Sequence, residues 1–109
     1  MAFDTRLKSP GVDDLFKTIL KIDSLENCYR FFEDLCTVKE IHAMSQRFEV
    51  ARLLLQKKTY SEIEQSTGAS TATISRINRT LQYGADGYQR VLDLEDKEEG
   101  LPDPEESSS

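Results

Sequence analysis

Apolar residues recur at three- and four-residue intervals along most of the chain, a spacing that places them on one face of an α-helix. The pattern predicts helices that begin near Val12 and Leu25, and a long helix between Thr37 and Gln56. No segment shows the alternation of apolar and polar residues that is typical of a strand. The chain is therefore expected to be all-α, with about six helices.

Hydroxyl residues mark several of the predicted helix starts. Thr37 and Glu40 have the spacing of a capping box, and so do Thr59 and Glu62. In such a pair the threonine oxygen and the glutamate carboxylate accept hydrogen bonds from backbone amides that would otherwise lack a partner. Ser70 is predicted to be the N-cap of a further helix, which follows the short helix that begins after Thr59.

The helical part of the chain has predictable limits. A sixth helix is expected over 88–94, so that one helical domain covers 12–95. It is preceded by a polar arm, 1–11, which we expect to be flexible. It is followed by an acidic tail, 96–109, which offers no core residues and is expected to be disordered.

Charge is distributed unevenly between these parts. The formal net charge of the 109 residues is -6, yet residues 93–109 hold eight acidic residues and one lysine. Residues 1–92 hold 13 basic and 12 acidic residues, and 47–82 holds six basic and three acidic ones. The acidity of the whole chain therefore does not exclude a nucleic-acid partner. The tail itself is either a solvated end or a competitor of phosphate for the basic part.

Several function classes are disfavoured by features that the sequence lacks. No apolar run is long enough to span a bilayer and no signal peptide is present, which predicts a cytoplasmic protein without a membrane partner. Cys28 and Cys36 are interpreted as buried thiols, and His42 has no further ligands at a spacing that predicts a metal site. No catalytic motif is evident, so we expect neither an enzyme nor a metal.

The segment between Thr59 and Leu81 has the parts of a helix-turn-helix. Gly68 can adopt the left-handed backbone of a tight turn between two helices. Ile63 in the first helix, and Ile74 and Ile77 in the second, have the spacing of inward-facing residues. This motif places its second helix in the DNA major groove.

The outward face of the second helix combines small hydroxylated residues with arginines. Such residues can approach base edges closely, contact a thymine methyl group, or bind phosphate and guanine. The predicted DNA-binding residues are Ser70, Thr71, Ala72, Thr73, Ser75, Arg76 and Arg79. A solvated helical hairpin without a DNA role is the alternative interpretation.

One residue departs from the commonest helix-turn-helix pattern. The position after Ile63 usually holds alanine, and here it holds Glu64, which suggests an unusual crossing of the two helices. A carboxylate on the presumed DNA side also motivates an alternative function. The chain would then be a dimeric helical protein-interaction module that has lost DNA binding.

The sequence resembles the tryptophan-repressor superfamily, and most of all its YerC/YecD branch. The resemblance covers about 12–95 and is carried by Leu35-Cys-Thr37, by Gly68-Ala-Ser-Thr-Ala-Thr-Ile-Ser-Arg76, and by the segments beginning Thr59-Tyr-Ser-Glu-Ile and Tyr83-Gly-Ala-Asp-Gly-Tyr. It implies an intertwined homodimer that presents two helix-turn-helix motifs to a roughly palindromic operator on double-stranded DNA. The function it implies is that of a sequence-specific transcriptional regulator, with repression as the expected mode.

The resemblance also implies a corepressor pocket. Thr37, Arg47 and Arg76 match residues that surround the indole in the namesake of the family. A glycine of that pocket is replaced by Ile77, whose side chain would project toward the ligand space or fill it. The replacement disfavours tryptophan, so the effector is either another small molecule or absent. Arg47 has a structural alternative, an ion pair with Glu40 or Glu49.

Overall fold

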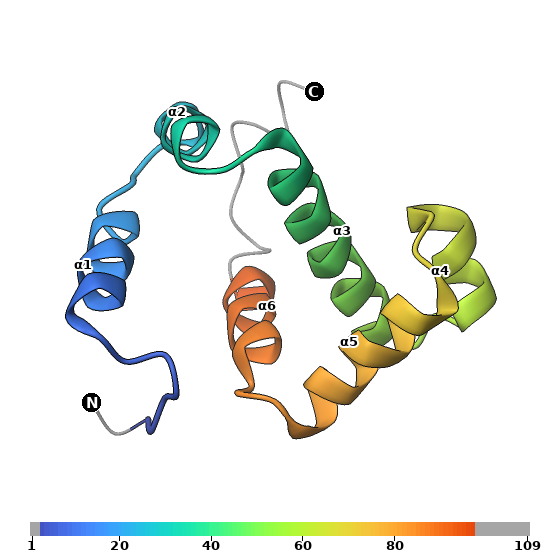
Figure 1. Ribbon diagram of the computed structural model, residues 1–109. Helices are drawn as coiled ribbons and strands as arrows, with labels where there is room; N and C mark the ends of the chain where they lie inside the picture. Colours follow the sequence, from blue (N-terminus) through green and yellow to red (C-terminus); the bar gives the residue numbers. More distant parts are fainter. Residues whose placement is uncertain (1–2, 98–109) are drawn as a thin grey trace. The chain divides into compact units, whose positions relative to one another are not determined.

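The computed structural model describes residues 3–97, and their side chains as far as residue 93 (Figure 1). Within these residues the chain forms α-helices and no strand, which confirms the predicted all-α class. The helices are α1 (Pro10–Ile19), α2 (Leu25–Leu35), α3 (Val38–Leu55), α4 (Tyr60–Thr67), α5 (Thr71–Tyr83) and α6 (Gly87–Lys97). They belong to two compact units, residues 1–41 and 42–109, and the boundary between the units falls within α3.

α1 begins earlier than the sequence pattern predicts. The arm was expected to reach residue 11, but the helix starts at Pro10. Ser9 is its N-cap, and the Ser9 side chain accepts a hydrogen bond from the Val12 amide at 3.1 Å. Proline is favoured at the first helical position because its missing N–H would have no partner there. The apparent end of the polar arm is therefore the start of the helix.

α6 ends later than predicted. It continues to Lys97, so the first two residues of the predicted tail are helical. The physical reason is the composition of the segment, because leucine, glutamate and lysine favour helix and the first helix breaker is Gly100. The rest of the predicted tail, 98–109, lies outside the described residues.

The first unit forms helices but buries little. Neither α1 nor α2 contains a buried residue, and Leu20 and Val38 are 84% and 72% exposed. Ser24 is the N-cap of α2. The predicted capping box at the start of α3 is also confirmed, since the Thr37 N–H donates to the Glu40 carboxylate at 2.8 Å and the Glu40 N–H donates to the Thr37 hydroxyl at 3.1 Å. The first of these bonds lowers the pKa of Glu40.

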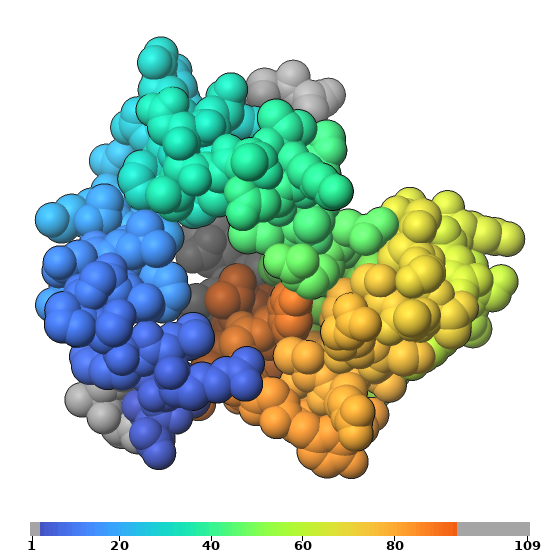
Figure 2. Space-filling view, viewed as in Figure 1, coloured from blue at the N-terminus to red at the C-terminus, as the bar shows by residue number. Residues whose placement is uncertain are grey.

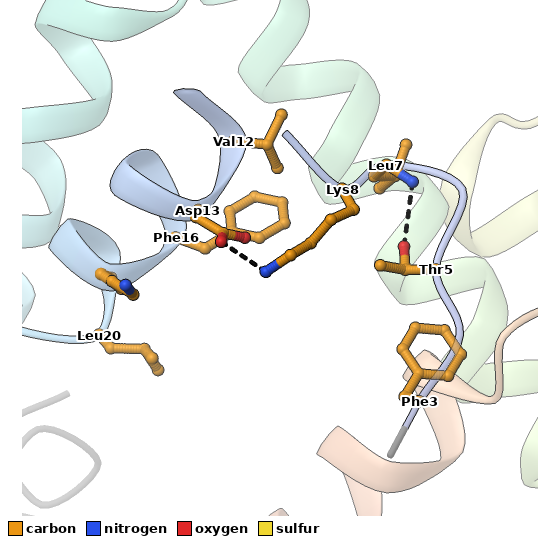
Figure 3. Close-up of a pocket in the computed structure, with 9 residues that line it drawn as sticks. Phe3, Thr5, Leu7, Lys8, Val12, Asp13, Phe16 and Leu20 are labelled. Atoms are coloured by element: carbon orange, nitrogen blue, oxygen red, sulfur yellow. Dashed lines mark hydrogen bonds and ion pairs between the residues drawn. The ribbon is translucent and has the colours of Figure 1, made fainter. Parts of the chain in front are cut away.

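An open apolar groove of about 410 Å³ lies between α1 and the segment that precedes it. Figure 3 shows its lining, which includes the exposed side chains of Phe3, Leu7 and Phe16. Lys8 and Asp13 form an ion pair beside these apolar side chains (Figure 3). The hydrogen bond from Lys8 lowers the pKa of Asp13. The groove is another sign that this unit leaves its apolar side chains uncovered within the described chain.

The second unit contains a closed core. The residues of its main buried cluster come from the second half of α3, from α4, from the turn after α4 and from α5. The members of this cluster are Val50, Ala51, Ile63, Ala69, Ile74 and Ile77. Leu54, Tyr60 and Leu81 pack around it. Burying such side chains stabilises the helix-turn-helix by about 1.5–3 kcal/mol for each large aliphatic group.

Candidate nucleic-acid interface

The candidate interface is built on α4 and α5, which match the predicted helix-turn-helix over 59–81. The predicted capping box at the start of α4 is confirmed, because the Thr59 N–H donates to the Glu62 carboxylate at 2.8 Å and the Glu62 N–H donates to the Thr59 hydroxyl at 3.1 Å. One turn further along, Ile63 is fully buried and fixes α4 on the core. α4 is thus defined at its start and along its inner face.

The turn between the two helices is held by its backbone and by two side chains. Gly68 has a φ of +73°, the left-handed conformation that glycine adopts at little cost. The Thr67 hydroxyl donates to the Ile63 carbonyl at 2.7 Å and accepts from the Ala69 N–H at 3.1 Å. From α3, the Gln46 amide donates to the Thr67 carbonyl at 3.2 Å. These contacts fix the direction in which α5 leaves the turn.

α5 begins at a serine cap, as predicted. The Ser70 hydroxyl oxygen accepts from the Thr73 N–H at 3.2 Å and donates to the Thr73 hydroxyl at 3.1 Å. Ile74 and Ile77 then point into the core, with exposed fractions of 0% and 4%. A helix anchored at its start and along one face presents its opposite face in a defined orientation, as base recognition requires.

The structure brings all seven predicted DNA-binding residues to the cap and first three turns of α5. Six of them are exposed, and these are Ser70, Thr71, Ala72, Ser75, Arg76 and Arg79. Thr73 is half-buried, and its N–H and its hydroxyl are both hydrogen-bonded to Ser70. Figure 2 shows part of the surface of α4 and α5, in yellow to orange. The face can therefore be reached by a large partner.

The charged groups on this face are available for a ligand. Within the described part of the chain, no acidic side chain forms an ion pair with Arg76 or Arg79. Lys57 and Lys58, between α3 and α4, are also exposed. Guanidinium groups next to small hydroxylated residues can bind phosphate oxygens and the acceptor edge of guanine.

Sequence reasoning missed two contacts of the helix-turn-helix. The Thr71 hydroxyl, at the first residue of α5, donates to the carboxylate of Glu64 on α4. The glutamate was recognised as unusual for its position, but the seven-residue separation crosses a turn and does not follow from helical spacing. The Gln46 bond to the turn was also missed, since no local pattern joins residues 46 and 67.

The four predicted effector residues have different environments. Thr37 caps α3 in the first unit, whereas Arg47, Arg76 and Ile77 belong to the second. Ile77, which is predicted to face inward and to project toward the ligand space or fill it, lies in the core, because its three-residue spacing from Ile74 places both on the inner face of α5. Arg47 is exposed and forms neither of the ion pairs considered for it. Glu49 pairs instead with Arg52, at 3.9 Å.

The described residues contain neither a candidate membrane span nor a candidate metal site. None of their helices combines the length and the apolar character that a bilayer span requires. Their histidine, cysteine and acidic side chains form no group of three that could hold a metal ion.

Comparison with known proteins gives consistent matches. The family model described as Trp repressor protein matches residues 10–96. The chain is 54% identical over 88 residues to the uncharacterized protein YerC of Bacillus subtilis, with 81% of this chain and 85% of that protein covered.

Two solved structures have the same fold. The TrpR-like protein of Eubacterium eligens is 49% identical, with a TM-score of 0.81 over 92% of this chain and 99% of that one. A Trp repressor candidate from Staphylococcus aureus is 50% identical, with a TM-score of 0.80 over 84% of this chain and 91% of that one. The family match over residues 10–96 includes the whole candidate interface.

Proposed function

Because the chain belongs to the Trp repressor protein family, we propose that it is a DNA-binding transcriptional regulator that recognises a two-fold symmetric operator as a homodimer. The observation that carries this proposal is the outer face of α5. It presents hydroxyl groups and two arginines without ionic partners among the described residues, on a helix held by a buried core. Repression, by blocking access of polymerase, is the proposed mode.

The homodimer is supported by the first unit. Its helices carry large apolar side chains that the described chain does not cover, such as Phe16, Leu20 and Tyr29. Exposed apolar surface of this extent is typical of a protein interface. A second copy with the same exposed helices would supply matching apolar surface, as in other two-fold symmetric dimers.

Selection from random DNA duplexes tests the function. We expect the full chain to enrich a sequence with two-fold symmetry whose half-sites are about one helical turn apart. Arg79→Ala is expected to bind the selected duplex weakly. Arg30→Ala, which removes an exposed arginine of α2, is expected to bind it normally. If no sequence is enriched, with or without candidate effectors, the regulator is excluded and the protein-interaction module is favoured.

We further propose that tryptophan is not the effector. The residue that stands in place of the family glycine is Ile77, and its side chain belongs to the core that positions α5. Arg47 and Arg76, with no ionic partners among the described residues, could serve an anionic effector of another kind. Affinity for the selected duplex should be the same with and without millimolar tryptophan. A tryptophan-dependent gain of tenfold would overturn this proposal.

A further inference from the structure

The Glu64 carboxylate occupies an unusual place for an acidic group in a DNA-binding motif. It follows the buried Ile63 on α4, is itself half-buried, and accepts a hydrogen bond from the hydroxyl of Thr71. No lysine or arginine among the described residues forms an ion pair with it. Its negative charge is therefore not neutralised by any neighbour that the structure describes.

The hydrogen bond leaves both side chains as hydrogen-bond acceptors. The Thr71 hydroxyl uses its single proton toward Glu64, so its oxygen can only accept further hydrogen bonds. An ionised carboxylate is also an acceptor without a proton. At the start of α5 the pair thus offers acceptors, and the methyl group of Thr71, to whatever approaches.

The charges around the start of α5 affect which DNA groups can approach this pair. The first amides of a helix carry partial positive charge and attract phosphate, and here Ser70 occupies only the amide of Thr73. A carboxylate next to these amides opposes a DNA phosphate at the same place. Among base edges in the major groove, cytosine and adenine present an amino donor, whereas guanine presents two acceptors.

We propose that Glu64, together with Thr71, is a specificity determinant of the DNA-binding surface. The pair accepts a hydrogen bond from the exocyclic amino group of a cytosine or adenine in each half-site, and it rejects guanine on that strand. Its charge also lowers affinity for DNA in general, because it repels phosphate from the start of α5. This inference rests on the proposed DNA-binding function.

Glu64→Gln is the informative substitution, because glutamine keeps the shape and the acceptor for Thr71 but loses the charge and adds an N–H donor. The matched control is Glu33→Gln on α2, which makes the same change of net charge at an exposed glutamate in the other unit. Selection from random duplexes, affinity for one random duplex at several salt concentrations, and thermal unfolding are measured for wild type and both variants.

We expect the Glu64→Gln variant to prefer an amino-bearing base about tenfold less strongly than wild type, at one position of each half-site. Affinity for the random duplex should rise about fivefold at low salt, and Glu33→Gln should leave both quantities at the wild-type level. A lower melting temperature with unchanged base preference and random-duplex affinity would assign Glu64 a structural role only and overturn the inference. If wild type itself selects no site, it is the proposed function that fails.

Discussion

The two units of the chain differ in how far their apolar side chains are buried. In the second unit, Val50, Ile63 and Ile74 are completely buried between α3, α4 and α5. In the first unit, α1 and α2 bury no residue, and Leu20 is 84% exposed. Both units contain well-capped helices, so the difference does not lie in helix formation. It lies in where the apolar faces find a partner.

This difference separates two tasks. The second unit has a core of its own, which holds α5 in place. Under the proposed function, α4 and α5 therefore act as a reading head for DNA. The first unit has amphipathic helices whose apolar faces have no cover within the described chain, and helices of this kind gain most of their stability from packing. Under the proposed function, DNA recognition belongs to the second unit and assembly to the first.

The largest effect should come from breaking the core of the second unit. Ile74→Ala removes a fully buried side chain and is expected to destabilise the fold by about 2–5 kcal/mol, with loss of DNA binding. Urea unfolding followed by circular dichroism measures the change. Val38→Ala, at a 72% exposed position, is the contrast and should leave the reading head intact. Similar damage to DNA binding from both would refute the division of tasks.

Next in size should be the difference between arginines of the two units. Arg79→Ala is expected to weaken binding to the selected and the random duplex alike, by about tenfold at low salt. It should also reduce the slope of log affinity against log salt by about 0.9, because it removes one phosphate contact. Arg30→Ala removes a cation that is paired with Glu26 at 3.0 Å, and it should change neither. Filter binding or fluorescence anisotropy over a range of salt gives both quantities. An unchanged slope for Arg79→Ala would exclude the phosphate contact.

A smaller effect should distinguish two glycines. Gly68→Ala should cost about 1 kcal/mol, because Gly68 has a φ of +73° that alanine adopts with strain. Gly11→Ala, within α1, should stabilise by about 0.5 kcal/mol, since that backbone is helical and an added Cβ meets no atom within 4 Å. Thermal unfolding of the two variants should therefore shift in opposite directions. A shift in the same direction would mean that the turn geometry is not the determining factor.

The smallest effect concerns the capping box at the start of α3. The Thr37 N–H holds the pKa of Glu40 below its ordinary value, so Glu40 contributes stability at neutral pH that is lost as the pH falls below the ordinary glutamate pKa and through the lowered one. Urea unfolding should show wild type more stable than Glu40→Ala at pH 7, with the difference shrinking toward pH 3. A difference for Glu40→Ala that stays flat between pH 7 and pH 3 would contradict the assigned role.

Local features of the fold could be predicted from the sequence, because capping boxes and serine caps act over three or four residues. Thr59 with Glu62, and Ser70 at the start of α5, are confirmed in this way. The first residue of α1 was misjudged, because Ser9-Pro10-Gly11 is equally typical of a loop and of a capped helix start. The division within α3 could not be foreseen, since it depends on which apolar faces meet.

The sequence predicts which side of α5 forms the candidate interface, but not the hydrogen bonds within that interface. The spacing of Ile74 and Ile77 determines which side of α5 is inward, and so which residues are outward. That Thr73 is half-buried, or that Thr71 donates to Glu64, depends on side-chain rotamers and on the crossing of two helices. Sequence patterns carry no information on these at the precision that base recognition needs.

Sedimentation equilibrium of the full chain tests the central claim most directly. The account predicts a dimer of about twice the 12.4 kDa chain mass. Leu20→Glu should shift it to monomer with the second unit still folded. The matched control Thr18→Glu, which adds the same charge at an exposed position of α1, should remain dimeric. A wild-type chain that sediments at 12.4 kDa under the conditions of DNA binding would contradict the claim that the first unit exists to join two reading heads.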